Sequence, residues 1–340
     1  MPSRFSLRPI HARVAATFQE AFVIPLAMLA VFAAIVAYGV TILPGGWNGD
    51  ASLNASLAFI CFVWVMGFGT RMFSPGSKLA GLIETLCIFA MLSLFAALAA
   101  SVLAIGGGAY IDDTLVALDK ALFPFFDWRS FTLNLPEYPR LYTALSYIYA
   151  SLNWQPFAFL VLVLFFGSLR DMEGLVSVWA LGMAGCILPF HFLPAKSPYI
   201  HYGISREDMP GSLVALPWDF LPKFEGMRSG AIDSIGMDNL TGMVTIPSFH
   251  ACAAVLLSWC WWRFRLLRWP FVLLNIGMAL AAVPIGGHYV IDIVAGAAVA
   301  IVAIALVNAY FARRDRSSAR RTANRDGSAN LTNEGLVPAG

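Results

Sequence analysis

Charged residues are scarce in this chain, since Asp, Glu, Lys and Arg together make up 12% of its 340 residues. A soluble domain of this length carries about twice that share. Hydrophobic residues make up 59% of the chain and fall in long runs rather than at amphipathic spacing. This composition excludes an ordinary soluble domain and predicts an all-α, polytopic membrane helix bundle.

Paired cysteines are also lacking. The chain has five cysteines with no CxxC pair, each within an apolar run: Cys61, Cys87, Cys186, Cys252 and Cys260. We therefore expect neither a disulfide framework nor a cysteine-based zinc site, and interpret these residues as small buried hydrophobes. The first apolar run lacks a small-residue cleavage site, which favours a retained helix over a cleaved signal peptide.

The apolar runs predict about eight transmembrane helices, since a span needs about 20 apolar residues. The runs cover residues 20–43, 52–73, 79–105, 154–170, 175–194, 247–262, 269–285 and 288–311, of which the sixth and seventh are short. Lys and Arg gather in the short flanks of these runs: Arg4, Arg8, Arg13, Arg71, Lys78, Arg170, Arg263, Arg265, Arg268, Arg313, Arg314, Arg316, Arg320 and Arg321. All lie on one side if both termini are cytoplasmic, as the positive-inside rule favours. The Ala-rich composition favours a bacterial inner membrane.

Two long connections then face the outside, residues 106–153 and 195–246. The first has stretches of helix-like periodicity that we expect to lie flat in the interface. The second is polar, rich in Gly and Pro and long for a loop, which predicts a functional role. The tail at 312–340 is predicted to be disordered. The stretch WCWWRFRLLRW at 259–269 is typical of an aromatic belt at the membrane boundary and not of a nucleic-acid surface.

Two polar motifs interrupt the apolar runs, VTIPSFHACAAV at 244–255 and VPIGGHYVIDIVAGA at 283–297. His288 and Asp292 are spaced i, i+4 on one helix face, so the carboxylate is suited to orient the imidazole. His250 begins the sixth span and His288 the eighth, and the helical hairpin between them returns both histidines to one membrane face.

Two helix N-termini meet at the same face and are expected to present unpaired backbone N–H groups, which attract anions. The hydroxyl of Ser248 adds a further donor. Two imidazoles, one carboxylate, a serine and two helix N-termini on one face predict phosphate chemistry.

Pro247-Ser248-Phe249-His250, followed by His288-Tyr289-Val290-Ile291-Asp292, resembles the second and third motifs of the type 2 phosphatidic acid phosphatase (PAP2) superfamily. The form is most similar to the branch that contains the inositol phosphorylceramide and sphingomyelin synthases. The resemblance covers a six-helix core at residues 79–311, preceded by two additional helices in residues 1–78.

The resemblance implies a role for each residue. His288 would take the phosphoryl group as a phosphohistidine, and Asp292 would orient it. His250 would protonate the leaving oxygen and then deprotonate the acceptor, which is water or an alcohol such as a ceramide. Ser248 and nearby backbone N–H groups would hold phosphate oxygens. The donor would be a lipid phosphate or phospholipid, with no metal and no cofactor, on the periplasmic or extracytoplasmic face.

The chain departs from the family pattern at two places. The phosphatase form carries an Arg six residues before the third-motif histidine, where this chain has Ala282, and this change favours a transferase. The first motif, a Lys followed seven residues later by Arg-Pro, is absent. The stretch FLPAKSPYIHYGISRED at 192–208 stands in its place and offers Lys196 and Arg206 as phosphate ligands, with Arg140 as a further candidate.

Other classes of function stay open from the sequence. Within the family, a phosphatase of lipid phosphates or isoprenyl diphosphates uses the same residues as a transferase. A metal-dependent hydrolase would use His250, His288 and Asp292 as zinc ligands. A proton-coupled transporter would use the His–Asp pair as a relay, but it would place polar residues at span midpoints and show inverted repeats, and the sequence has neither.

Overall fold

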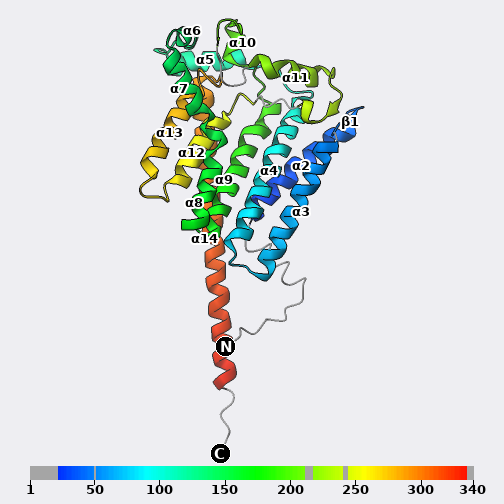
Figure 1. The fold of residues 1–340 in the computed structure, drawn as a ribbon, viewed down its shortest axis with the longest axis vertical. Coiled ribbons are helices and arrows are strands. Elements are labelled where there is room, and N and C mark those ends of the chain that lie inside the picture. The colour runs from blue at the N-terminus through cyan, green and yellow to red at the C-terminus, as the bar shows by residue number, and fades with distance from the viewer. Residues whose placement is uncertain (1–21, 50, 211–216, 240–243, 335–340) are drawn as a thin grey trace, which may run out of the picture.

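The computed structural model describes residues 22–49, 51–210, 217–239 and 244–334, with side chains as far as Arg320. Its main body is a helix bundle whose members run alternately toward and away from one end (Figure 1). The bundle helices are α2 (Val23–Ile42), α3 (Ala51–Phe73), α4 (Lys78–Ala104), α8 (Gln155–Phe166), α9 (Leu169–Ile187), α12 (Phe249–Trp261), α13 (Arg268–Ala281) and α14 (Val290–Glu334). The predicted all-α polytopic bundle is confirmed.

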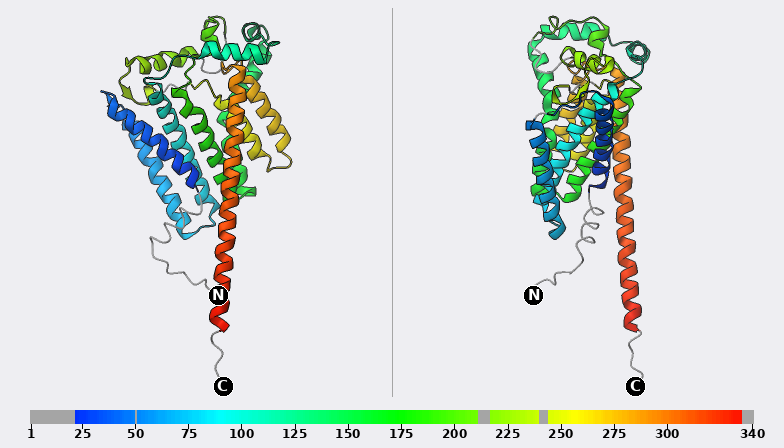
Figure 2. Two further views of the ribbon diagram at one scale, coloured as in Figure 1. Left: turned by 180° about the vertical axis from the view of Figure 1, so that it is seen from behind. Right: turned by 90° about the vertical axis from the view of Figure 1, so that its right-hand side faces the viewer.

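Short helices from the two long connections cover one end of this bundle (Figures 1 and 2). This capping layer consists of α5 (Asp112–Leu122), α6 (Trp128–Asn134), α10 (Pro198–His201) and α11 (Pro217–Ser229). Helix α7 (Pro139–Ala150) leads from the layer down to α8. The remaining elements are 3-10 turns and a pair of two-residue parallel strands: η1 (Leu135–Glu137), η2 (Ser151–Asn153), η3 (Leu188–His191), η4 (Met237–Asn239), β1 (Gly46–Trp47) and β2 (Ser234–Ile235).

Every predicted span contains a helix, but the helices differ in length. Among the described residues, α2, α3, α4, α9 and α14 are long and apolar enough to cross a membrane, and α7 with α8 adds a sixth span if this pair, bent by 51°, is counted as one. Helices α12 and α13 have 13 and 14 residues. At 1.5 Å per residue they extend about 20 Å, short of the roughly 30 Å hydrocarbon core.

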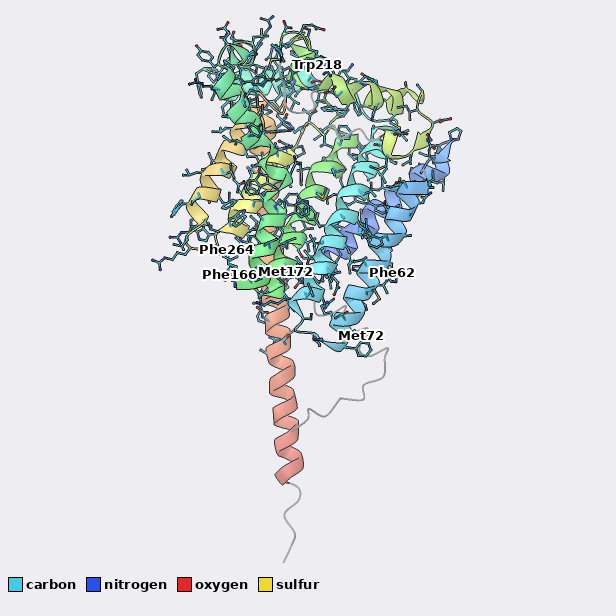
Figure 3. All side chains as sticks on the ribbon, in the orientation of Figure 1. Phe62, Met72, Phe166, Met172, Trp218 and Phe264 are labelled. Carbon is cyan, nitrogen blue, oxygen red and sulfur yellow. The ribbon has the colours of Figure 1, made fainter. Side chains whose placement is uncertain are left out.

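The bundle has inner and outer helices. In the apolar stretch of α9, 72% of the residues are buried, and in that of α4, 56% are buried. In the apolar stretch of α3, only 11% are buried. Large apolar side chains such as Phe62 of α3 and Phe166 of α8 are exposed, and Figure 3 shows Phe62 on the outer side of the bundle. Broad apolar exposure of this kind suits a surface surrounded by lipid.

Buried ion pairs join the helices at the end away from the capping layer. Arg71 of α3 contacts both carboxylate oxygens of Glu84 on α4, at 2.6 and 3.1 Å. Glu173 of α9 accepts two hydrogen bonds from Arg314 of α14, at 2.7 and 2.9 Å. Each charge buried at these helix joints therefore has a bidentate partner, as a buried charge requires.

The C-terminal segment differs from the sequence prediction. Instead of a disordered tail from residue 312, α14 continues to Glu334 and projects beyond the bundle (Figure 2). Two contacts account for the first turns past the span. Arg314 reaches back to Glu173, and Asp315 pairs with Arg170 at 2.9 Å. The helix is thus fastened to α9 just where the apolar run ends.

Helices α12 and α14 begin side by side beneath the capping layer. The backbone N–H of Ser248 donates to the carbonyl oxygen of Asp292 at 3.0 Å. A Cβ atom at Gly296 would lie 2.2 Å from the carbonyl oxygen of Ser248, so only glycine allows this approach. The close start of these two helices brings the two histidine motifs together.

Replacing Gly296 by Val is expected to push α14 away from α12. Overpacking of this kind costs about 1–3 kcal/mol, which lowers the midpoint of thermal unfolding by roughly 2–10 °C. Unfolding in detergent measures the shift. Gly69→Val in α3 is the matched control, because a Cβ there meets nothing within 4 Å. Equal shifts in the two variants would contradict the close-approach argument.

Candidate active site

A cavity of about 610 Å³ lies where the capping layer meets the bundle. Both motif histidines line it, His250 from the first turn of α12 and His288 from the residues just before α14. This confirms that the two histidines meet at one end of the bundle. The other polar side chains in the lining are Ser93, Tyr149, Asn153, Ser197 and Thr245.

The imidazole of His288 is held in one orientation by two acceptors. Its Nδ1 lies 2.9 Å from the carbonyl oxygen of Thr245 and 3.4 Å from Oδ2 of Asp292. Because a carbonyl oxygen can only accept, Nδ1 carries a proton and the lone pair of the neutral ring is on Nε2. The indole N–H of Trp128 donates to the backbone oxygen of His288 at 3.0 Å and fixes the main chain. This arrangement suits a nucleophilic histidine.

Asp292 is fully buried behind His288. Its Oδ2 accepts a hydrogen bond from the backbone N–H of Tyr289 at 2.9 Å, and Oδ1 has no hydrogen-bond partner among the described residues. The sequence pairs Asp292 with His288, and the structure does so as well. The contact of the imidazole with the Thr245 carbonyl oxygen is shorter than its contact with Asp292. A backbone contact of this kind cannot be read from a side-chain motif.

Two carboxylates of α5 hold the segment that carries His288. Asp119 accepts from the backbone N–H groups of Val290 and Ile291, both at 2.8 Å. Burial nevertheless raises the pKa of Asp119. The prediction of unpaired N–H groups at the start of α14 is therefore wrong for these two, because a carboxylate of the protein itself already occupies them.

Asp112, at the start of α5, accepts from the backbone N–H groups of Lys196 and Ser197 and from the hydroxyl of Tyr289 at 2.8 Å. Neither Asp112 nor Asp119 lies in the two histidine motifs. Their signal is a spacing of seven residues, which puts two carboxylates on one face of a helix in a chain that has few charges.

His250 lies face to face with the ring of Tyr149, with 3.8 Å between ring centroids and 13° between ring planes. Tyr149 belongs to α7 and also lines the cavity. The imidazole of His250 therefore has an aromatic ring against one face while it remains in contact with the cavity.

The three predicted phosphate-binding side chains lie outside the cavity lining. Ser248 is fully buried and caps α12, its hydroxyl oxygen accepting from the N–H of Ala251 at 3.4 Å. Because α12 begins at Phe249, Ser248 is its N-cap residue, and Pro247 lies before the helix. Arg206 pairs with Asp219 in the capping layer.

Lys196 forms an ion pair with a residue of α11. Its ammonium group lies 2.8 Å from Oε1 of Glu225 and 4.3 Å from the centre of the Tyr110 ring. Although partial burial opposes ionisation, hydrogen bonds from Lys196 and Tyr110 lower the pKa of Glu225. Lys196 therefore fastens the capping layer, and the phosphate role predicted for it has no support from its position. Arg140, the further candidate, is exposed on α7.

The zinc alternative requires at least three ligating side chains around one point among the described residues. Among them, no group of three or more His, Cys, Asp or Glu side chains is placed to hold a metal ion. His250, His288 and Asp292 thus do not form such a group in the described part of the chain.

The fold and the cavity together define a polytopic helical membrane protein with a paired-histidine site at one end of its bundle. Within that class, the family model of the PAP2 superfamily matches residues 113–306, and the chain belongs to this superfamily. Membership supports a phosphatase or phosphotransferase of lipid phosphates. No curated protein and no solved structure matches the chain. Helix α4, which lines the cavity with Ala97 and Ala100, lies outside the matched residues.

Replacing Asp292 by Asn is expected to lower kcat roughly 10–100-fold, the usual effect of losing the partner that orients a functional histidine. A larger loss is not expected, because the Thr245 carbonyl still holds Nδ1 of His288. The rate of product release from a lipid phosphate measures the effect. Asp113→Asn, at a 98% exposed carboxylate of the same end, is the control. A loss of 10⁴-fold or more would show that Asp292 alone fixes the tautomer.

Proposed function

We propose that this protein is a metal-independent lipid phosphotransferase, similar to the inositol phosphorylceramide and sphingomyelin synthase branch of its superfamily. It takes a phosphate-linked headgroup from a phospholipid and passes it to an alcohol acceptor such as a ceramide. The observation that carries this proposal is a cavity lined by two histidines and, among the described residues, by no Lys or Arg. The sequence at 211–216 and 240–243 contains no Lys or Arg either.

The charge of the donor decides between the two activities of the superfamily. A phosphate monoester carries about −1.5 to −2 charges at neutral pH. A phosphodiester carries a single negative charge. Burying the additional charge beside neutral side chains, without a cation to pair it, is costly. The lining therefore favours a phosphodiester, the form in which a phospholipid carries its headgroup, over the substrate of a phosphatase.

The chemistry follows in two steps that use the same two histidines. Nε2 of His288 attacks phosphorus, the bond from phosphorus to the lipid oxygen breaks, and His250 gives that oxygen a proton. The headgroup phosphate is then attached to His288. In the second step His250 takes the proton of the acceptor hydroxyl, the acceptor oxygen attacks phosphorus, and the bond to Nε2 breaks.

The apolar part of the cavity indicates where a lipid chain lies. Its apolar lining includes Ala97 and Ala100 of α4, Met183 of α9, and Phe220 of α11 in the capping layer. A volume near 610 Å³ is within the range of pockets that enclose a drug-sized ligand. It accommodates a phosphate with part of one lipid, and the remaining chains stay in the bilayer.

A panel of donors in vesicles tests this proposal. Phosphatidylcholine, phosphatidylethanolamine and phosphatidylinositol are expected to react at least about tenfold faster than phosphatidic acid, since one missing hydrogen bond to a charged group already costs about 1.5–3 kcal/mol. A fluorescent ceramide and a fluorescent diacylglycerol serve as acceptors, and excess chelator is present throughout. Faster hydrolysis of phosphatidic acid would favour the phosphatase, and loss of activity in chelator would favour the metal-dependent alternative.

We also propose that both termini are cytoplasmic and that the cavity opens on the periplasmic side of a bacterial inner membrane. In a variant without native cysteines, Glu207→Cys should react with an impermeant maleimide in intact cells. Leu266→Cys, a 90% exposed position between α12 and α13, should react only after permeabilisation. The opposite pattern would reverse the orientation.

A further inference from the structure

Tyr149 lines the cavity and belongs to neither histidine motif. Its ring covers one face of the His250 imidazole, at 3.8 Å between centroids and 13° between planes. It reaches this place from α7, outside both histidine motifs. Among the described residues, no other aromatic ring stacks on His250.

The segment that leads to His288 also approaches the Tyr149 ring closely. A Cβ atom at Gly286 would lie 2.8 Å from Cε2 and 3.0 Å from the hydroxyl oxygen of Tyr149. The neighbouring Ile148 packs at Gly277 of α13, where an added Cβ would lie 3.2 Å from its Cγ2. The ring of Tyr149 therefore stacks on His250 and also lies close to the backbone just before His288.

We infer that Tyr149 is a positioning residue for His250, an inference that rests on the proposed acid–base role of that histidine. Flat contact with the ring restricts rotation of the imidazole about its side-chain bonds. The electron-rich face of the tyrosine ring also attracts an imidazolium more strongly than a neutral imidazole. Tyr149 thereby holds the His250 imidazole in place for proton transfer to the leaving oxygen.

The stack can be tested without a substrate. In protein labelled only at histidine, the ring current of Tyr149 is expected to shift the His250 ring proton signals upfield, and His250→Ala identifies these signals. Tyr149→Phe should keep the shift because it retains the ring, and Tyr149→Leu should remove it. Tyr147→Leu, at a 68% exposed position of the same helix, is the control and should change nothing. An unchanged His250 signal in Tyr149→Leu would overturn the inference.

The leaving group provides the functional test. Each probe pair has one nitrophenyl ester and one alkyl ester. The first pair is 4-nitrophenyl phosphocholine and dioctanoyl phosphatidylcholine, and the second is 4-nitrophenyl phosphate and octyl phosphate. The rate of phosphoenzyme formation is measured in a single turnover. Tyr149→Leu should slow this step roughly 10–100-fold for the alkyl ester. This loss is part of the rate enhancement of about 10²–10⁴-fold that a positioned general acid contributes. The nitrophenyl ester needs no proton and should react at nearly the wild-type rate. Tyr149→Phe should resemble wild type with both.

His250→Ala separates the two possible failures. If it slows the alkyl ester selectively and Tyr149→Leu slows both esters equally, Tyr149 has only a structural role and the inference is wrong. If His250→Ala itself shows no selectivity, the acid role proposed for His250 is wrong. Should neither probe pair be turned over, the histidine signals alone decide whether the stack exists.

Discussion

The site depends on one constraint, that α12 and α14 start in direct contact at the same end of the bundle. The hydrogen bond from the Ser248 N–H to the Asp292 carbonyl and the close approach at Gly296 set this contact. His250 follows Ser248 by two residues, and His288 precedes Asp292 by four residues. Once the two helix starts are fixed, both imidazoles face one cavity, and the remaining contacts refine their orientation.

The scarcity of charge in the chain explains how the remaining contacts are made. In an apolar bundle each buried charge must have a partner, so the few carboxylates serve as anchors. Glu84 and Glu173 bind arginines at the end away from the capping layer. Asp112 and Asp119 bind backbone N–H groups at the capped end, around the segment that carries His288. Backbone and aromatic contacts, from Thr245, Trp128 and Tyr149, then orient the histidines themselves.

The sequence predicts the parts of this protein that depend on pattern, and it misses those that depend on tertiary contact. Apolar runs predict the positions of the bundle helices, and motif order predicts that His250 and His288 meet. Lys196 and Ser248 have suitable chemistry near the motifs, but a local ion pair and a helix cap occupy them. No sequence motif marks Tyr149. Its contact with His250 forms only when α7 packs against α13, which the sequence pattern does not reveal.

The central claim is that His288 carries the phosphate group between donor and acceptor, and trapping that intermediate tests it most directly. The purified protein is mixed with a radiolabelled donor phospholipid without acceptor, quenched at alkaline pH, digested and mapped by mass spectrometry. Phosphorylation is expected at His288. It should still form in His250→Ala when a nitrophenyl ester is the donor, and it should be absent in His288→Ala. A label on His250, or full turnover with no label on any residue, would contradict it.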